Sequence, residues 1–86
     1  MKRLPSQIEN TIIKAVYENP ETSVYELSKK CSIDRSSVYS VLIRLERDKY
    51  VTSYSIVINL TNNKVYRLTH KGEEIYNFLS RWDMLV

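Results

Sequence analysis

The sequence of 86 residues is poor in the residues on which several classes of protein depend. Its single cysteine, Cys31, cannot form a disulfide within the chain, which favours a cytoplasmic protein. We expect Cys31 to be a small buried residue; a redox switch is the alternative. With one glycine there is no glycine-rich phosphate loop, and the lone histidine, His70, makes neither a metal site nor a nucleophile–base pair. No hydrophobic run approaches the ~18 residues of a membrane span, and no signal peptide is visible. We therefore expect no enzyme, no metal or other cofactor, and no membrane protein.

The net charge of the chain is only +3, but the basic residues are unevenly distributed. Residues 29–72 carry nine basic and three acidic residues, whereas the segments before and after them are net negative. A protein that neutralises phosphates releases their counterions. A concentration of positive charge in the middle of the chain therefore suits a surface that binds a polyanion.

Local signals predict two helices in the first third of the chain. A Ser-x-x-Glu capping box begins a helix at about residues 6–18, and Asn19-Pro20 ends it because the residue before proline avoids the helical region. A second capping box, from Ser23 to Glu26, begins a shorter helix. A turn of three or four residues then leads to a third helix, which is the spacing of a helix-turn-helix.

The third helix, within residues 34–50, has two different faces. Asp34 is its N-cap. One stripe at helical spacing is hydrophobic and is expected to face the core: Val38, Val41, Leu42 and Leu45. The opposite face is rich in hydroxyls and arginine: Ser36, Ser37, Tyr39, Ser40, Ile43, Arg44 and Arg47. Small hydroxyls beside arginines suit close approach to phosphates and base edges, although a merely solvated helix face is the alternative.

A β-hairpin and a last helix follow. Residues 51–59 and 65–69 have the β-branched and aromatic content of strands. Asn62-Asn63 is predicted as the hairpin tip, because asparagine tolerates left-handed backbone. A three-residue loop is preferred over a two-residue loop, since it keeps four hydrophobic residues on one face by pairing Ile58 with Tyr66 and Ile56 with Leu68. Thr69 is expected to cap the last helix.

Three strings carry a resemblance to a known family. They are SSVY at 36–39, LIRLER at 42–47 and YRLTHKG at 66–72, the last similar to a Tyr-x-Leu-Thr-x-x-Gly junction between a hairpin and a helix. With the order of elements, they make the chain resemble the winged-helix transcription regulators of the PadR-like and MarR-like groups, over roughly residues 8–80.

The resemblance implies a fold and a mode of binding. The fold would be an α+β, mainly helical winged helix-turn-helix occupying residues 1–86 as one domain. The helix at 34–48 would enter the major groove of DNA, the hairpin at 51–69 would be the wing with its tip near the minor groove or backbone, and residues 70–86 would form a dimerisation helix. The family often has glycine after the third helix, where this chain has Lys49, at a cost of ~1 kcal/mol if that backbone is left-handed.

Ten residues are candidates for contact with double-stranded DNA. They lie on the third helix and at the predicted hairpin tip: Arg35, Ser36, Ser37, Tyr39, Ser40, Arg44, Arg47, Asn62, Asn63 and Lys64. Arg44 would take guanine or phosphate and Arg47 phosphate. Tyr39 could instead be half-buried against the second helix. Lys29 and Lys30 are expected to be helix-end charges more than specific contacts.

The last helix carries a hydrophobic stripe, which is predicted to form a dimer interface: Ile75, Phe78, Leu79, Trp82 and Leu85. A two-fold homodimer would cover this stripe and would read two half-sites. The predicted function is sequence-specific DNA binding by a dimeric transcription regulator, a repressor more than an activator. The alternative is a winged-helix protein-interaction module that does not bind DNA. The sequence identifies no small-molecule effector.

Overall fold

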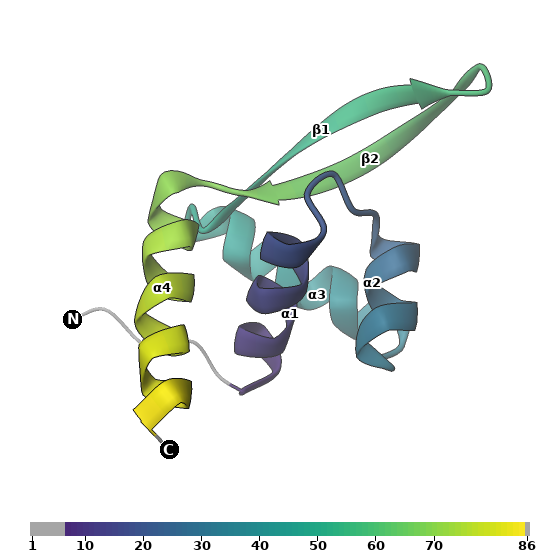
Figure 1. Cartoon of the computed structure of the whole chain (residues 1–86). Coiled ribbons are helices and arrows are strands. Elements are labelled where there is room, and N and C mark those ends of the chain that lie inside the picture. Colours follow the sequence, from purple (N-terminus) through teal and green to yellow (C-terminus); the bar gives the residue numbers. More distant parts are fainter. Residues whose placement is uncertain (1–6, 86) are drawn as a thin grey trace.

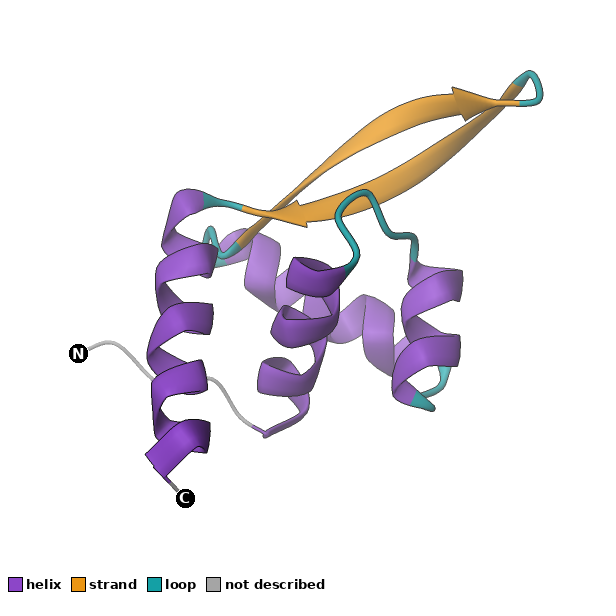
Figure 2. Cartoon of the chain, viewed as in Figure 1, coloured by secondary structure: helices purple, strands orange, loops and turns teal. Residues whose placement is uncertain are grey.

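The computed structural model describes the backbone of residues 7–85 and the side chains of residues 7–81. Its elements follow the predicted order, and the hairpin projects as an arm from a body of helices (Figure 1). They are α1 (Gln7–Glu18), α2 (Val24–Cys31), α3 (Arg35–Arg47), β1 (Val51–Ile58), β2 (Thr61–Leu68) and α4 (His70–Leu85). The two strands are antiparallel (Figure 2). The predicted mainly helical α+β class is confirmed.

Helix α1 lies at the centre of the body, where it contacts α2, α3, α4 and β2. Its residues Ile12, Ile13 and Val16 are buried. They belong to one core with the predicted stripe of α3, whose four members Val38, Val41, Leu42 and Leu45 are all buried. The helical period of 3.6 residues leaves the opposite face of α3 toward solvent. Among the described helices, none combines the length and hydrophobicity needed to cross a membrane.

The helix ends are fixed by the predicted caps. Ser23 and Glu26 form a complete capping box, with each backbone N–H donating to the other side chain at 3.2 Å. Asp34 caps α3 by accepting the N–H of Ser37 at 3.0 Å. Ser32 ends α2 with left-handed backbone, φ 55°. The cap predicted at Ser6 lies outside the described residues.

The position of the hairpin tip differs from the prediction. The tip is the two-residue loop Asn59-Leu60, and both residues have positive φ, 51° and 63°. This is the pattern of a type I′ turn, whose twist matches that of the flanking strands. Asn62-Asn63, predicted at the tip, instead lies within β2.

The predicted register is wrong for the same reason. Ile58 pairs with Thr61 and is 50% exposed, while Tyr66 pairs with Ser53. The prediction assumed that Ile56 and Ile58 face the core. The outer half of the hairpin extends beyond the body, so it has no buried face, and hydrophobic content there does not select a register.

The inner end of the hairpin is held by the loop between α1 and α2. Tyr66 donates its N–H to Thr22 O at 2.8 Å, and the N–H of Thr22 donates to Tyr66 O at 3.3 Å, so the loop between α1 and α2 forms an isolated antiparallel β-bridge with β2. The Tyr54 hydroxyl also donates to Glu21 Oε2 at 2.6 Å. Val65 and Tyr66 are buried, and burial raises the pKa of the Tyr66 hydroxyl.

The junction between the hairpin and α4 explains the Tyr-x-Leu-Thr-x-x-Gly string. Thr69 caps α4 by accepting the N–H of Gly72 at 3.1 Å, and its hydroxyl donates to Lys49 O at 2.5 Å. Lys49 has φ 66°, so the left-handed backbone considered at this position is present. A Cβ on Gly72 would lie 2.0 Å from Tyr50 O, so only glycine allows α4 to pack this closely.

Candidate nucleic-acid interface

The outward ridge of α3 is formed by four exposed residues at helical spacing, Ser36, Ser40, Ile43 and Arg47. None of them is acidic. Arg47 lies 3.9 Å from Asp48, but both side chains are largely exposed, so this pair holds the guanidinium only weakly. The ridge therefore offers hydroxyls, one aliphatic side chain and a cation to an approaching surface.

Beside the ridge, Arg44 lies in a more sheltered position. It lines a shallow depression of about 310 Å³ together with Ser37, Ser40 and Ile8 of α1. Its Nε is buried and has no hydrogen-bond partner within the described part of the chain. A buried donor without a partner is costly, so the Nε of Arg44 is an unsatisfied polar group in this depression.

The N-terminus of α3 carries a compact hydrogen-bonded group. The hydroxyls of Ser36 and Ser37 donate to the Asp34 carboxylate at 2.6 and 2.8 Å. These bonds lower the pKa of Asp34 to about 2, so the carboxylate is charged at neutral pH. The two serines therefore direct their protons inward, and their lone pairs remain available to accept hydrogen bonds. The sequence reasoning treated Asp34 only as a cap and missed this arrangement.

A second group lies where α2 meets α3. Tyr25 is 47% exposed, and Lys29 Nζ and Arg35 Cζ each lie 4.7 Å from the centre of its ring. The ring thus holds two cations together, an arrangement that suits phosphate oxygens. Tyr25 was not among the predicted site residues. The spacing of four residues between Tyr25 and Lys29 on a helix was the signal that could have indicated it.

The hairpin residues predicted to contact DNA do not form its tip. Asn62 and Asn63 lie along β2, and Lys64 pairs with Ser55 and lies 5.7 Å from the ring of Tyr66. Tyr39 of α3 is 47% exposed. About half of this side chain is therefore accessible from outside, as a DNA contact would require.

Comparison with known proteins identifies the fold. No protein-family model matches the sequence, and no curated protein sequence matches it. Among solved structures, the transcriptional regulator SlyA is 20% identical, with a TM-score of 0.83 over 92% of this chain and 55% of that one. FabT of Streptococcus pneumoniae, solved in complex with DNA, is 22% identical, with a TM-score of 0.81 over 94% of this chain and 56% of that one. A PadR-like transcriptional regulator from Bacillus cereus is 27% identical, with a TM-score of 0.76 over 91% of this chain and 82% of that one.

The chain has the winged-helix fold of transcriptional regulators. In this fold α2 and α3 are the helix-turn-helix and the β1–β2 hairpin is the wing. The chain spans only about half the length of SlyA and FabT, 55% and 56% respectively.

Five residues of α4 were predicted to form a dimer interface, and the side chains of three of them are described. Ile75 packs on the core, Leu79 is half-buried, and Phe78 is 45% exposed. The side chains of Trp82 and Leu85 lie outside the described residues. The predicted stripe is therefore divided between the core and the surface.

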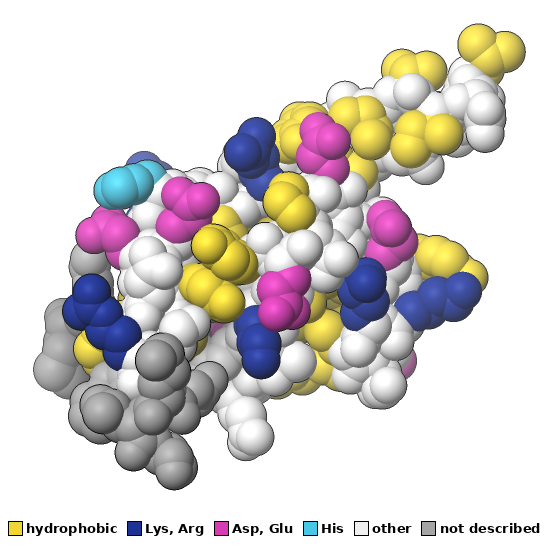
Figure 3. Space-filling model, in the orientation of Figure 1, with side chains coloured by type: hydrophobic (Ala, Val, Ile, Leu, Met, Phe, Trp, Pro, Cys, Tyr) yellow, Lys and Arg dark blue, Asp and Glu magenta, His cyan; other side chains and the backbone are white. Residues whose placement is uncertain are grey.

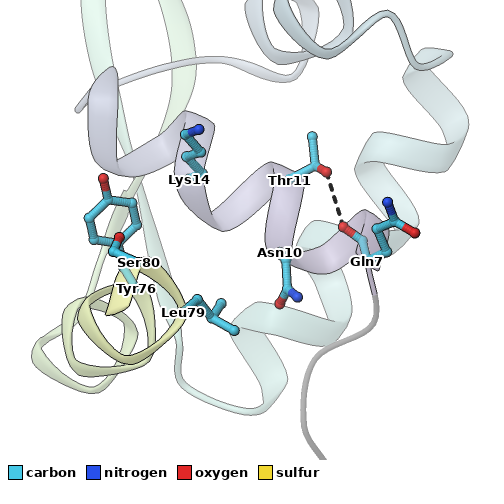
Figure 4. A pocket seen from close by; sticks show the side chains of 7 residues that line it. All are labelled: Gln7, Asn10, Thr11, Lys14, Tyr76, Leu79 and Ser80. Carbon is cyan, nitrogen blue, oxygen red and sulfur yellow. Dashed lines mark hydrogen bonds between the residues drawn. The ribbon is translucent and has the colours of Figure 1, made fainter. Parts of the chain in front are cut away.

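A groove of about 620 Å³ is lined by residues of α1 and α4. Figure 4 shows Tyr76, Leu79 and Ser80 of α4 on one side and polar residues of α1, such as Asn10 and Lys14, on the other. At one end of the groove, Tyr76 stacks on Tyr17 with ring centres 3.9 Å apart and planes at 11°. This stack fixes α4 against α1, so the groove is a feature of the folded winged helix.

The remaining reactive residues lie apart from the interface. Cys31 is partly buried, and burial raises the pKa of its thiol, which disfavours the reactive thiolate. His70 Nε2 lies 3.5 Å from Glu74 on the exposed first turn of α4. Within the described residues, no three potential metal ligands come together.

Proposed function

We propose that this winged helix binds double-stranded DNA sequence-specifically as a two-fold homodimer and regulates transcription. The observation that supports it most is the ridge of Ser36, Ser40, Ile43 and Arg47, which is exposed, free of acidic residues and flanked by arginine. The solved complex of FabT with DNA, a structure of the same fold, supports the same partner. Repression is the simpler role, because occupying a site on DNA requires binding alone.

The contacts divide by position. Ser36, Ser40 and Arg44 would face base edges in the major groove. Ser36, whose proton is donated to Asp34, would accept hydrogen bonds there, Ser40 would accept or donate, and Arg44 would bind guanine. Arg47, the Tyr25–Lys29–Arg35 group and Lys64 would face phosphates, which supply most of the affinity. Asp34, charged and next to the two serines, would accept from the cytosine amino group and disfavour bases that offer only acceptors.

Dimerisation would use α4, with residues 70–86 as the dimerisation helix. Phe78 on this helix is 45% exposed, and a second copy of the chain would cover this part of its surface. Two copies related by a two-fold axis would place their α3 helices ~34 Å apart, one turn of DNA, and the site would be nearly palindromic. Sedimentation of the wild type against Phe78→Arg tests this, and a wild type that stays monomeric at micromolar concentration contradicts it.

Binding to DNA is tested with random duplexes over a range of salt concentrations. Wild-type affinity should fall steeply with salt, and Arg47→Ala should reduce the magnitude of the logarithmic slope by about one unit. Arg44→Ala should weaken the selected sequence by ~1–3 kcal/mol and relax specificity. Lys14→Ala removes the same charge from the α1–α4 side and serves as the matched control, with no expected change in specificity. Absence of salt-dependent duplex binding would contradict the proposal and favour the protein-interaction module.

A further inference from the structure

Ile43 is the hydrophobic member of the outward ridge of α3, and it differs from the other aliphatic residues of that helix. It is 47% exposed, whereas the other four are buried on the opposite side: Val38, Val41, Leu42 and Leu45. Among the described residues, Ile43 belongs neither to the buried core nor to the partly buried residues packed against it. Packing within the described chain therefore does not account for an isoleucine at this position.

The neighbours of Ile43 on this face are polar. Ser40 precedes it and Arg47 follows it along the ridge, and Arg44 lies beside it. An interface with another protein has a hydrophobic centre several residues wide, and one isoleucine between serine and arginine does not provide such a centre. This surface is therefore better suited to a partner that is polar except for one small hydrophobic group.

The outer wing has a different kind of hydrophobic surface. Val57, Ile58 and Leu60 are exposed together there, and Figure 3 shows hydrophobic side chains along this arm. Ile58 is 50% exposed, which is close to the value for Ile43. The two isoleucines therefore have the same side chain and similar exposure in different surroundings, and Ile58 can serve as a control for Ile43.

The base edges in the major groove of DNA match the surroundings of Ile43. They present nitrogen and oxygen atoms that form hydrogen bonds, and the C5 methyl group of thymine is the hydrophobic group among them. An isoleucine that faced a phosphate or a base amine would remove this polar group from water without offering it a hydrogen bond, which is unfavourable. An isoleucine that faced a thymine methyl would bury hydrophobic surface on both sides. With α3 in the major groove, thymine is therefore the base that Ile43 favours.

The spacing of the ridge predicts where this thymine would lie. On a helix in the major groove, residues about three to four positions apart contact successive bases. Ser36, Ser40 and Ile43 have this spacing. Ile43 would thus face the base pair next to the one that Ser40 contacts, and the DNA sequences that the protein selects should share a thymine there.

We propose that Ile43 is a specificity-determining residue that packs on the C5 methyl group of a thymine, next to the base pair that Ser40 contacts. This role rests on the proposed DNA binding and deepens it, because it names one base and the chemical group by which that base is recognised. Since 5-methylcytosine carries the same methyl group, it would be favoured over cytosine at this position. A hydrophobic cavity on another protein is the competing partner for Ile43, and it becomes an outcome of the test.

The test uses a duplex that the wild type selects from a random pool, in which each thymine is replaced in turn by uracil. This replacement removes the C5 methyl group and leaves the hydrogen-bonding atoms and the phosphate charge unchanged. The variants are Ile43→Ala, which removes the contact, and Ile43→Leu, which keeps an aliphatic side chain of the same size. Ile58→Ala makes the matched change on the wing and is the control. Because both isoleucines are about half exposed, thermal melting should show little loss of stability in any variant.

The wild type, Ile43→Leu and Ile58→Ala should each bind about fourfold more weakly when one particular thymine is replaced by uracil. Ile43→Ala should bind the thymine and uracil duplexes equally, with an unchanged salt slope because no charge is lost. When the same base pair is changed to C·G, methylation of the cytosine at C5 should strengthen binding by the wild type about fourfold and should not affect Ile43→Ala.

A wild type that binds duplex DNA but selects no shared thymine, or tolerates uracil at every position, would overturn this role of Ile43 and leave the proposed function standing. Discrimination that persists in Ile43→Ala would also overturn it, because another residue would then contact the methyl group. If Ile43→Ala matches the wild type on every duplex, the contact is refuted and a protein partner for Ile43 is favoured. If the wild type itself binds no duplex, the proposed function fails together with the contact, so the two failures are distinguishable.

Discussion

The two ends of the wing contain the same kinds of residue in opposite surroundings. At the inner end Val65 and Val51 are each 2% exposed, whereas at the outer end Val57 is 67% exposed. The inner end is covered by the helices and paired with Thr22, and the outer end extends past both. Side chains of a strand alternate between its two faces, so the sequence shows which residues share a face. Whether that face is buried depends on contact with the helices.

The largest effect is expected from substituting Gly72, at the junction between the inner end of the wing and α4. In Gly72→Ala the new Cβ would meet Tyr50 O at 2.0 Å, so α4 must move away from the end of α3. We expect the free energy of unfolding to fall by about 3 kcal/mol in urea denaturation. Asn77→Ala, at an exposed position of the same helix, is the control and should change little. Equal effects of the two substitutions would mean that the junction tolerates the displacement.

A matched pair of valines compares the two ends directly. Val65→Ala should lower the free energy of unfolding by about 2 kcal/mol, because it removes buried methyl groups and leaves a cavity. Val57→Ala, the same change at a position 67% exposed, should stay within about 0.5 kcal/mol of the wild type. Urea denaturation measures both. A large effect at Val57 would show that the outer wing is covered, for example by a second copy of the chain.

A smaller effect is expected at Tyr54, between the two ends. Its hydrogen bond to Glu21 is the main reason why the pKa of the Tyr54 hydroxyl is raised above its ordinary value of 10. A group whose pKa is raised by folding stabilises the protein below its unfolded pKa, and this contribution disappears as the pH rises through the folded pKa. Tyr54→Phe should therefore melt slightly below the wild type at neutral pH, and the difference should vanish at pH values well above 10. A constant difference across this range would assign the stabilisation to something other than the hydroxyl proton.

The helices could be predicted because their signals are local. Capping at Ser23 and Asp34 and the hydrophobic stripe of α3 depend on neighbours within a few residues, and the structure reproduces them. The strand register could not be predicted in the same way. The register depends on how far the helices cover the hairpin, which is a property of the whole fold. The prediction assumed that all hydrophobic residues of the hairpin face inward. For this reason it placed the tip at Asn62-Asn63, whereas the tip is Asn59-Leu60.

The candidate site shows the same division. The exposed face of α3 follows from its period, so its residues were identified from sequence. The Tyr25–Lys29–Arg35 group joins two helices, and the sheltered position of Arg44 depends on Ile8 of α1. Such contacts between elements appear only when the elements are placed in space.

Several residues in left-handed backbone are positions at which a substitution would stabilise this protein. Five described residues other than glycine have positive φ, Glu21, Ser32, Lys49, Asn59 and Leu60, while the only glycine serves a crowded helix contact. Side chains other than asparagine cost about 1 kcal/mol each in left-handed backbone, and glycine at Ser32 or Lys49 would relieve that cost without altering the core. Adaptation of this molecule to higher temperature could thus proceed through its loops alone, one residue at a time.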